Sequence, residues 1–259
     1  MDLPFIPLQQ TQDFLVCLAR VFALIAAIPV FGGVQVAVRI RIGLAVMISL
    51  LLFPLVAPYT PKTQLSLVHF GLLLANEVLL GALIGLVTQM IFAAISFGGT
   101  VIGYQMGFAA ANIFDPQTTQ QLSLMSQFVN ILAMLAFLTL NMHHFFFHAI
   151  IESFVLLPPG TLDFSGDAAA VLMKLGGNMF TLGVKFSAPI LALLLIVNLV
   201  LGILARVFPQ LNVFMLSFPL NIGITFLVIS LTLGAVFTVF RREFDTTGEH
   251  ILILFQLLG

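Results

Sequence analysis

The chain has 259 residues, of which 61% are hydrophobic and only 7% are charged, and its formal net charge is −1. Soluble domains carry about 25% charged residues, so this chain is too apolar to cover its own surface in water and belongs in a membrane or inside a large apolar assembly. No cluster of basic residues is longer than Arg241-Arg242, which argues against nucleic-acid binding. The single cysteine, Cys17, excludes a disulfide framework within the chain.

The apolar runs of the chain are the expected helices, because a membrane span needs about 20 apolar residues. In chain order these runs are Phe14–Gly33, Ile42–Pro58, Leu67–Ala94, Ile95–Ala111, Ser123–Leu157, Asn178–Ala205 and Val213–Phe240. None of them alternates with the period of a strand, so the sequence predicts an all-α fold of integral-membrane-type helical hairpins with no soluble domain attached.

Polar residues and prolines predict where these helices break. The run Ser123–Leu157 is too long for one straight helix, and Asn-Met-His-His at 141–144 is the expected break because Asn and His favour helix ends. Prolines remove a backbone donor and kink or end a helix, and those expected to do so are Pro189, Pro209 and Pro219. The last segment, Glu243–Gly259, has a polar start and an apolar end, so it is expected to lie at a membrane interface or to pack against a partner.

Aromatic composition is unusual for a chain that faces lipid. There are 27 Phe but no Trp and only 2 Tyr, whereas membrane spans normally carry Trp and Tyr at both interfaces. This imbalance indicates that much of the apolar surface contacts other protein rather than lipid headgroups.

Glycines recur at four-residue spacing in the third and fourth runs, as Gly81 and Gly85 and as Gly99, Gly103 and Gly107. Residues four apart share one face of a helix, and small residues on that face let another helix approach closely in apolar surroundings. The spacing therefore predicts close helix packing, either between subunits or within the chain.

Asp115 is the only charged residue between Glu77 and Glu152. Asp is a preferred N-cap and Pro is favoured at the first helical position, so Asp115-Pro116 predicts the start of a helix. Non-helical backbone at membrane depth is tolerated only where it is buried in protein or lines a cavity. An interruption just before Asp115 therefore points to a cavity or channel.

Charged residues inside apolar runs should face the protein interior or water, which applies to Glu77 and Lys185, although nothing in the sequence places these two together. His144, His148 and Glu152 share one helix face and could be metal ligands. No nearby Cys or Asp completes such a set, so a polar or wetted face is favoured. With no catalytic triad, phosphate-binding loop or Cys cluster, the sequence predicts neither an enzyme nor a cofactor or metal site.

Four short stretches carry a resemblance to a known family. They are FDPQ at 114–117, LNMHH at 140–144, LPPG at 157–160 and RVFPQLNVFMLSFPLNIGI at 206–224. Together they resemble FliR-type chains, the flagellar branch of the type III secretion export-gate family, over essentially the whole length. Met142 stands where many of those chains have glycine, which bears only on the tightness of that turn.

The resemblance implies a subunit of the export gate in the bacterial inner membrane, at the flagellar basal body. Such chains work with FliP and FliQ, joined by FlhB and FlhA, and pass unfolded flagellar proteins through the gate. A FliP-like part would cover about 1–175 and a FliQ-like hairpin with a C-terminal tail about 176–259. One copy would complete a helical, multi-subunit assembly.

The same resemblance implies a channel plug between Gly107 and Pro116, with glycines 99, 103 and 107 as its hinge. The obstruction would be formed by Gly107, Phe108, Ala109, Ala110, Ala111, Asn112, Ile113 and Phe114, and anchored by Asp115 and Pro116. The tip of the FliQ-like hairpin would comprise Pro209, Gln210 and Asn212, which together with Pro219 would contact partner chains.

Two other functions compete with this one. Broken helices carrying polar side chains are also typical of a small-solute secondary transporter, although polar groups suited to a midplane solute site are scarce. An intramembrane metalloenzyme built on His144, His148 and Glu152 is the other alternative.

Overall fold

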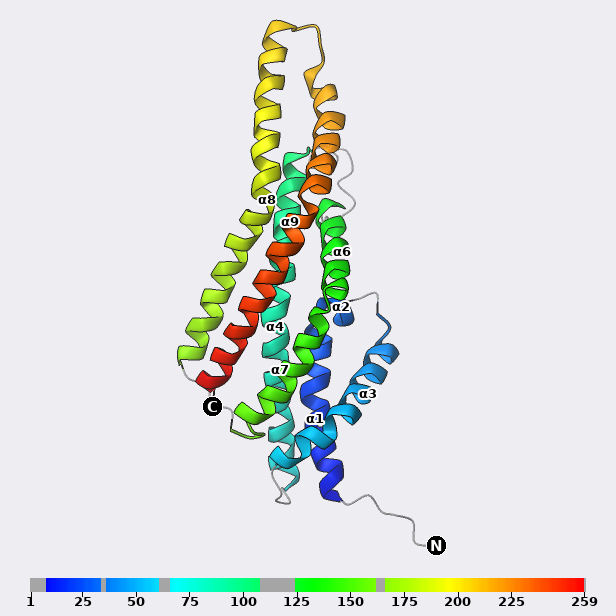
Figure 1. Ribbon diagram of the computed structural model, residues 1–259, viewed down its shortest axis with the longest axis vertical. Coiled ribbons are helices and arrows are strands. Elements are labelled where there is room, and N and C mark those ends of the chain that lie inside the picture. Colours follow the sequence, from blue (N-terminus) through cyan, green and yellow to red (C-terminus); the bar gives the residue numbers. More distant parts are fainter. Residues whose placement is uncertain (1–7, 34–35, 61–65, 108–123, 162–165, 259) are drawn as a thin grey trace. The chain divides into compact units, whose positions relative to one another are not determined.

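The computed structural model describes residues 8–33, 36–60, 66–107, 124–161 and 166–258, and in these ranges the chain is helical with no strand (Figure 1). The helices are α1 (Leu8–Ala27), α2 (Pro29–Gly32), α3 (Val38–Val56), the 3₁₀ helix η1 (Ala57–Tyr59), α4 (Leu67–Gln105), α6 (Leu124–Thr139), α7 (Met142–Leu156), α8 (Gly166–Val207) and α9 (Val213–Leu258). The predicted all-α fold is confirmed.

Within the described ranges, five helices are long and apolar enough to cross a membrane, and the bent pair α6 and α7 makes a sixth when it is counted as one span. Two of the five, α8 and α9, are more than twice the length of about 20 residues that one crossing needs, with 42 and 46 residues. Length and composition therefore make the chain a membrane protein whose longest helices extend well beyond a single crossing.

The break between α6 and α7 lies where the sequence predicts it. Asn141 has φ 56° and ψ 28°, a left-handed conformation that the short polar side chain of Asn tolerates better than most. The amide of His144 donates to the Asn141 carbonyl at 3.1 Å, which starts α7. The two helices are bent by 67° at this point.

Several predicted helix boundaries are wrong; for example, α8 begins at Gly166 and not near Asn178. The runs Leu67–Ala94 and Ile95–Ala111 form one helix, α4 (Leu67–Gln105). Ala94 and Ile95 are consecutive, and no proline or turn residue lies at this junction to end the helix. The C-terminal segment is not a separate tail either, because α9 continues through it to Leu258. One apolar face of this segment is buried within the chain, with Phe244, Ile251, Leu254, Phe255 and Leu258, whereas Leu252 and Ile253 are exposed.

Four prolines show three different effects on the helices. Ile28 is extended, with φ −71° and ψ 123°, as expected for a residue before a proline, and Pro29 then opens α2. Pro209 lies in the turn between α8 and α9, so it ends a helix as predicted. Pro189 and Pro219 lie inside α8 and α9, which continue through them.

The chain divides into two compact units, each assembled from separate stretches. Unit 1 comprises Met1–Met90, Asn141–Leu175 and Phe244–Gly259, and unit 2 comprises Ile91–Leu140 and Gly176–Glu243. Three helices, α4, α8 and α9, contribute residues to both units. The division near residue 175 into a FliP-like part and a FliQ-like hairpin stays a prediction.

Candidate functional site

The predicted plug begins where α4 ends in unit 2. The amide of Met106 donates to the Ile102 carbonyl at 2.9 Å, and the amide of Gly107 donates to the Tyr104 carbonyl at 3.1 Å. Gly107 has φ 92°, a conformation that favours glycine after the last turn of a helix. The remaining predicted plug and anchor residues lie outside the described residues; they are Phe108, Ala109, Ala110, Ala111, Asn112, Ile113, Phe114, Asp115 and Pro116.

Both chain ends that flank residues 108–123 are held in the same buried cluster of unit 2. Met106 precedes the segment and is 0% exposed, and Met125 follows it and is 2% exposed. The other buried members of the cluster are Ile102 on α4 and Ile190 and Leu194 on α8. The residues on either side of the segment are therefore anchored in one buried apolar cluster.

Phe218 of α9 lies directly against Gly107. A Cβ atom at Gly107 would approach the Cδ1 atom of the Phe218 ring to 2.7 Å, closer than carbon atoms tolerate. Phe218 makes an edge-to-face contact with Phe214, with ring centroids 4.8 Å apart. Glycine is thus required at position 107 both for its positive φ and for the room that the ring occupies.

The glycine spacing of α4 corresponds to close helix contacts within the chain. A Cβ at Gly81 would overlap the carbonyl oxygen of Arg20, and one at Gly85 would overlap the Cβ of Ala27, both on α1. In unit 2, Gly99 lies against α6, where a Cβ would approach the Cα of Ser126 to 2.8 Å. Gly103 is buried. Contacts of these glycines with other subunits stay a prediction.

Sequence reasoning missed a buried charged cluster in unit 1. The Arg20 guanidinium on α1 and the Glu77 carboxylate on α4 are both 0% exposed, and Nε of Arg20 donates to Oε2 of Glu77 at 2.6 Å. Arg20 also donates through Nη1 to the Ser153 hydroxyl at 2.9 Å and through Nη2 to the Leu157 carbonyl at 3.1 Å. Its guanidinium carbon lies 3.8 Å from the centre of the Phe154 ring.

This cluster joins α1, α4 and the end of α7. Leu157 is the C-cap of α7, so the guanidinium satisfies a terminal carbonyl at the negative end of that helix. Gly81 lies one turn after Glu77 and lets α4 approach the backbone of α1 at Arg20. The close approach provided by the glycine is thus what brings the carboxylate within reach of its cation.

The prediction that Glu77 faces the interior is confirmed, whereas Lys185 is exposed and does not pair with it. The missing partner had a signal in the sequence: Arg20 is the only charged residue in the run Phe14–Gly33. A charge in an apolar run requires an opposite charge or hydrogen bonds when it is buried. Two runs with one charge each, of opposite sign, are therefore candidates for pairing.

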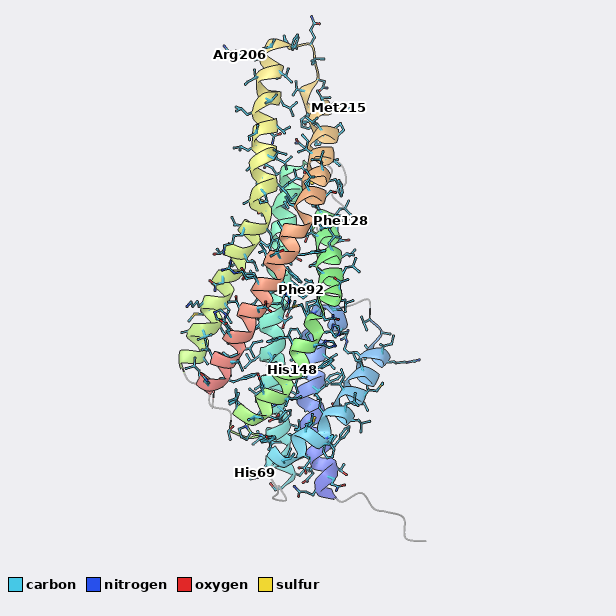
Figure 2. All side chains as sticks on the ribbon, viewed as in Figure 1. His69, Phe92, Phe128, His148, Arg206 and Met215 are labelled. Atoms are coloured by element: carbon cyan, nitrogen blue, oxygen red, sulfur yellow. The ribbon has the colours of Figure 1, made fainter. Side chains whose placement is uncertain are left out.

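The predicted hairpin tip is the turn between α8 and α9, with Arg206 at the end of one helix and Met215 in the first turn of the next (Figure 2). Asn212 caps α9, since its Oδ1 accepts the amide of Met215 at 3.2 Å. Pro209, Gln210 and Asn212 are exposed. Their contacts with partner chains stay a prediction.

We call residues 195–220, which comprise the end of α8, the turn and the start of α9, the hairpin arm. Apolar side chains cover this hairpin arm. The large ones that are exposed are Leu195, Ile196, Leu199, Val200, Ile203, Val207, Phe208, Leu211, Phe214, Met215, Leu216 and Leu220. Contiguous exposed apolar surface of this kind marks a contact with protein or lipid.

The polar face of α7 is exposed. His148 lies on α7 (Figure 2), and His144, His148 and Glu152 all face outwards from unit 1. Among the residues that the structure describes, no group of three or more His, Cys, Asp or Glu side chains is placed to hold a metal ion.

Comparison with known proteins identifies the family. Residues 11–247 match the family "Bacterial export proteins, family 1". The chain is 35% identical over 249 residues to "Flagellar biosynthetic protein FliR" of Bacillus subtilis (strain 168), which covers 95% of each chain. It is 39% identical over 244 residues to the protein of that name from Pectobacterium carotovorum subsp. carotovorum, covering 92% of this chain and 91% of the relative.

A third relative, "Flagellar biosynthetic protein FliR" of Escherichia coli (strain K12), is 34% identical over 240 residues, covering 90% of each chain. The match to the family extends over nearly all of α1 to α9, so it includes both compact units and the hairpin arm. The chain belongs to family 1 of the bacterial export proteins.

Proposed function

We propose that this protein is a core subunit of the flagellar type III protein export gate. It forms, with FliP and FliQ, the channel for unfolded flagellar subunits, and FlhB and FlhA join the complex. It is located in the bacterial inner membrane at the flagellar basal body. The observation that carries this proposal is the match to family 1 of the bacterial export proteins over residues 11–247, together with relatives named as flagellar biosynthetic proteins.

The hairpin arm supports a role inside an assembly. Its exposed leucine, isoleucine and phenylalanine side chains find no cover within the described part of this chain. Large apolar side chains of this kind are buried against a partner or in lipid. In a gate built from several apolar subunits, the arm supplies a ready contact surface for FliP-like or FliQ-like helices.

We further propose that residues 107–116 form the channel plug, for which the supports at Met106 and Met125 are the structural argument. Met106, directly before this stretch, and Met125, nine residues after Pro116, share one buried cluster, so the described chain on either side of the stretch has a fixed support. Alanines and two phenylalanines make the stretch apolar, so it obstructs water and ions when no polypeptide passes. Small side chains allow a passing polypeptide to push the segment aside.

Co-expression tests the subunit role. The chain is produced together with FliP and FliQ from the same bacterium, extracted in mild detergent and purified through a tag on FliP. We expect one complex of constant stoichiometry that contains all three chains. Recovery of FliP and FliQ without this chain, at unchanged yield and size, contradicts the proposal.

A further inference from the structure

Two oxygen atoms on successive turns of α9 are buried in unit 2 without a hydrogen-bond partner among the described residues. They are Oδ1 of Asn221 and Oγ1 of Thr225, whose residues are 5% and 0% exposed. The amide nitrogen of Asn221 is engaged, because it donates to Oδ1 of Asn198 on α8 at 3.3 Å. Buried polar atoms in proteins are nearly always hydrogen-bonded, so these two lack the partner that such atoms normally have.

Thr225 differs from other threonines in the helices. Several of them donate to the carbonyl four residues earlier: Thr88 at 3.3 Å, Thr100 at 2.9 Å, Thr232 at 2.7 Å and Thr238 at 3.0 Å. The Thr225 hydroxyl makes no such bond to the backbone of its own helix. Its hydrogen-bonding capacity is therefore available to a group other than the protein backbone.

The spacing of the two atoms selects the ligand. Side chains four residues apart on a helix have Cβ atoms about 5–6 Å apart. One bridging water with two hydrogen bonds of about 2.8 Å spans about 5.6 Å, so it can reach polar atoms on both side chains. Both atoms are buried within the chain, so a side chain of another subunit reaches them only if the packing around α9 opens.

We propose that Asn221 and Thr225 bind one water molecule between α8 and α9, which donates to Asn221 Oδ1 and is hydrogen-bonded to Thr225 Oγ1. The ligand class follows from the two atoms, since a pair of neutral oxygen atoms suits water and is too few to replace the hydration shell of an ion. On α8 the site lies at the base of the hairpin arm, one turn beyond the buried cluster. Leu194, one turn before Asn198 on α8, belongs to the buried cluster, whereas the hairpin arm begins at Leu195.

At this position the water completes a polar contact between two otherwise apolar helices. Asn198, Asn221 and Thr225 then fix which turn of α8 faces which turn of α9, because a shift by one turn would leave the amides and the hydroxyl unpaired. The site does not depend on the proposed export function, since it belongs to the packing of the hairpin itself.

The test compares Thr225→Val with Thr225→Ser and Thr232→Val in the purified complex with FliP and FliQ. Valine matches the shape of threonine but cannot hold the water, whereas serine can. We expect Thr225→Val to lower the thermal unfolding midpoint by about 2–4 °C and Thr225→Ser to stay closer to the unchanged chain. Thr232→Val, which removes only a bond to its own helix, should have the smaller effect of the two valine variants.

A midpoint that is unchanged or raised in Thr225→Val overturns the proposal, because the hydroxyl then has no ligand to lose. If that variant does not accumulate, a high-resolution map of the unchanged complex decides. We expect a single density peak within about 3 Å of both oxygen atoms. A side chain of another subunit at that place, or a Thr225 hydroxyl bonded to the Asn221 backbone carbonyl, contradicts a water site.

Discussion

Arg20 and Glu77 are 57 residues apart in the chain, yet their side chains form a fully buried ion pair with Nε and Oε2 2.6 Å apart. Removing two charges from water is costly, and the cost is offset only when both are paired and further hydrogen-bonded. Here the Ser153 hydroxyl and the Leu157 carbonyl supply additional bonds to Arg20, whereas Oε1 of Glu77 is buried without a partner among the described residues, so the carboxylate depends on Arg20 alone. The cluster therefore tolerates replacement of the whole pair better than loss of one member.

Arg20→Met should destabilise the chain by about 3–5 kcal/mol, because it leaves the Glu77 carboxylate buried without its cation. The double variant Arg20→Met/Glu77→Leu should recover most of that loss. Thermal unfolding in detergent measures both. Arg206→Met, which removes an exposed charge at the end of α8, is the control and should change stability by no more than about 0.5 kcal/mol. An Arg20→Met variant as stable as the control would show that the pair contributes nothing.

Gly81→Ala should destabilise unit 1, because the added Cβ overlaps the Arg20 carbonyl oxygen and pushes α4 away from α1. Overpacking of this kind costs about 1–3 kcal/mol. Gly71 on the same helix has no atom within 4 Å of the corresponding Cβ position, so Gly71→Ala should be neutral or stabilising by up to about 1 kcal/mol. The unfolding midpoints of the two variants are compared directly; equal midpoints contradict the close approach of α4 to α1.

Gly107→Ala should be destabilised for two separable reasons. Its φ of 92° is strained for alanine, at about 1–3 kcal/mol, and the new Cβ meets the Phe218 ring. Relative to Phe218→Ala alone, adding Gly107→Ala should cost only the strain, since the ring is gone. Gly177→Ala, in open space on α8, is the control. If the double-mutant cycle gives no coupling between the two positions, the Phe218 contact at Gly107 does not exist in solution.

Deleting residues 108–112 while keeping Gly107 should make cells leak ions through the assembled gate. Met106 and Met125 remain in their buried cluster, so the complex with FliP and FliQ should form at normal yield. Sodium or proton entry is measured in cells that express the variant or the unchanged chain at equal levels. An ion-tight cell that contains the deletion complex at full yield would count against a plug in this segment.

Leu199→Lys combined with Ile203→Lys should abolish co-purification with FliP and FliQ, because both side chains belong to the exposed apolar surface of the hairpin arm. The chain itself should still accumulate, since these residues are exposed within it. Thr181→Lys, at an exposed polar position lower on α8, is the matched control and should co-purify normally. Full recovery of the complex with the double variant would exclude the arm as a contact surface.

Local signals of the sequence predict much of the fold. Continuous apolar runs predict the helices, and Asn141 predicts the break between α6 and α7 because a left-handed residue is a local preference. Helix continuity is harder to predict. Two consecutive glycines, Gly98 and Gly99, suggest a break, yet α4 continues through them because their small size lets α8 and α6 pack closely against it. The polar residues 241–249 likewise end an apolar run without ending α9.

Pairing between helices depends on three-dimensional packing and is the part that sequence patterns predict least. The apolar run around Glu77 predicts that its carboxylate is buried, but Arg20 is identified as its partner only once α1 and α4 are in contact. The same holds for Phe218 against Gly107. The plug itself, apart from Gly107, lies outside the described residues and stays a prediction.

The contacts of Arg20 also set an order for the making of the protein. Arg20 leaves the ribosome 133 residues before Ser153 and 137 residues before Leu157, so during most of translation its guanidinium lacks two of its three hydrogen-bonding groups. Glu77 on α4 is made earlier, but until the end of α7 has been synthesised the remaining two hydrogen bonds can be made only with water, lipid headgroups or the insertion machinery. The set of contacts that holds the guanidinium of Arg20 is therefore completed only after α7 has been made.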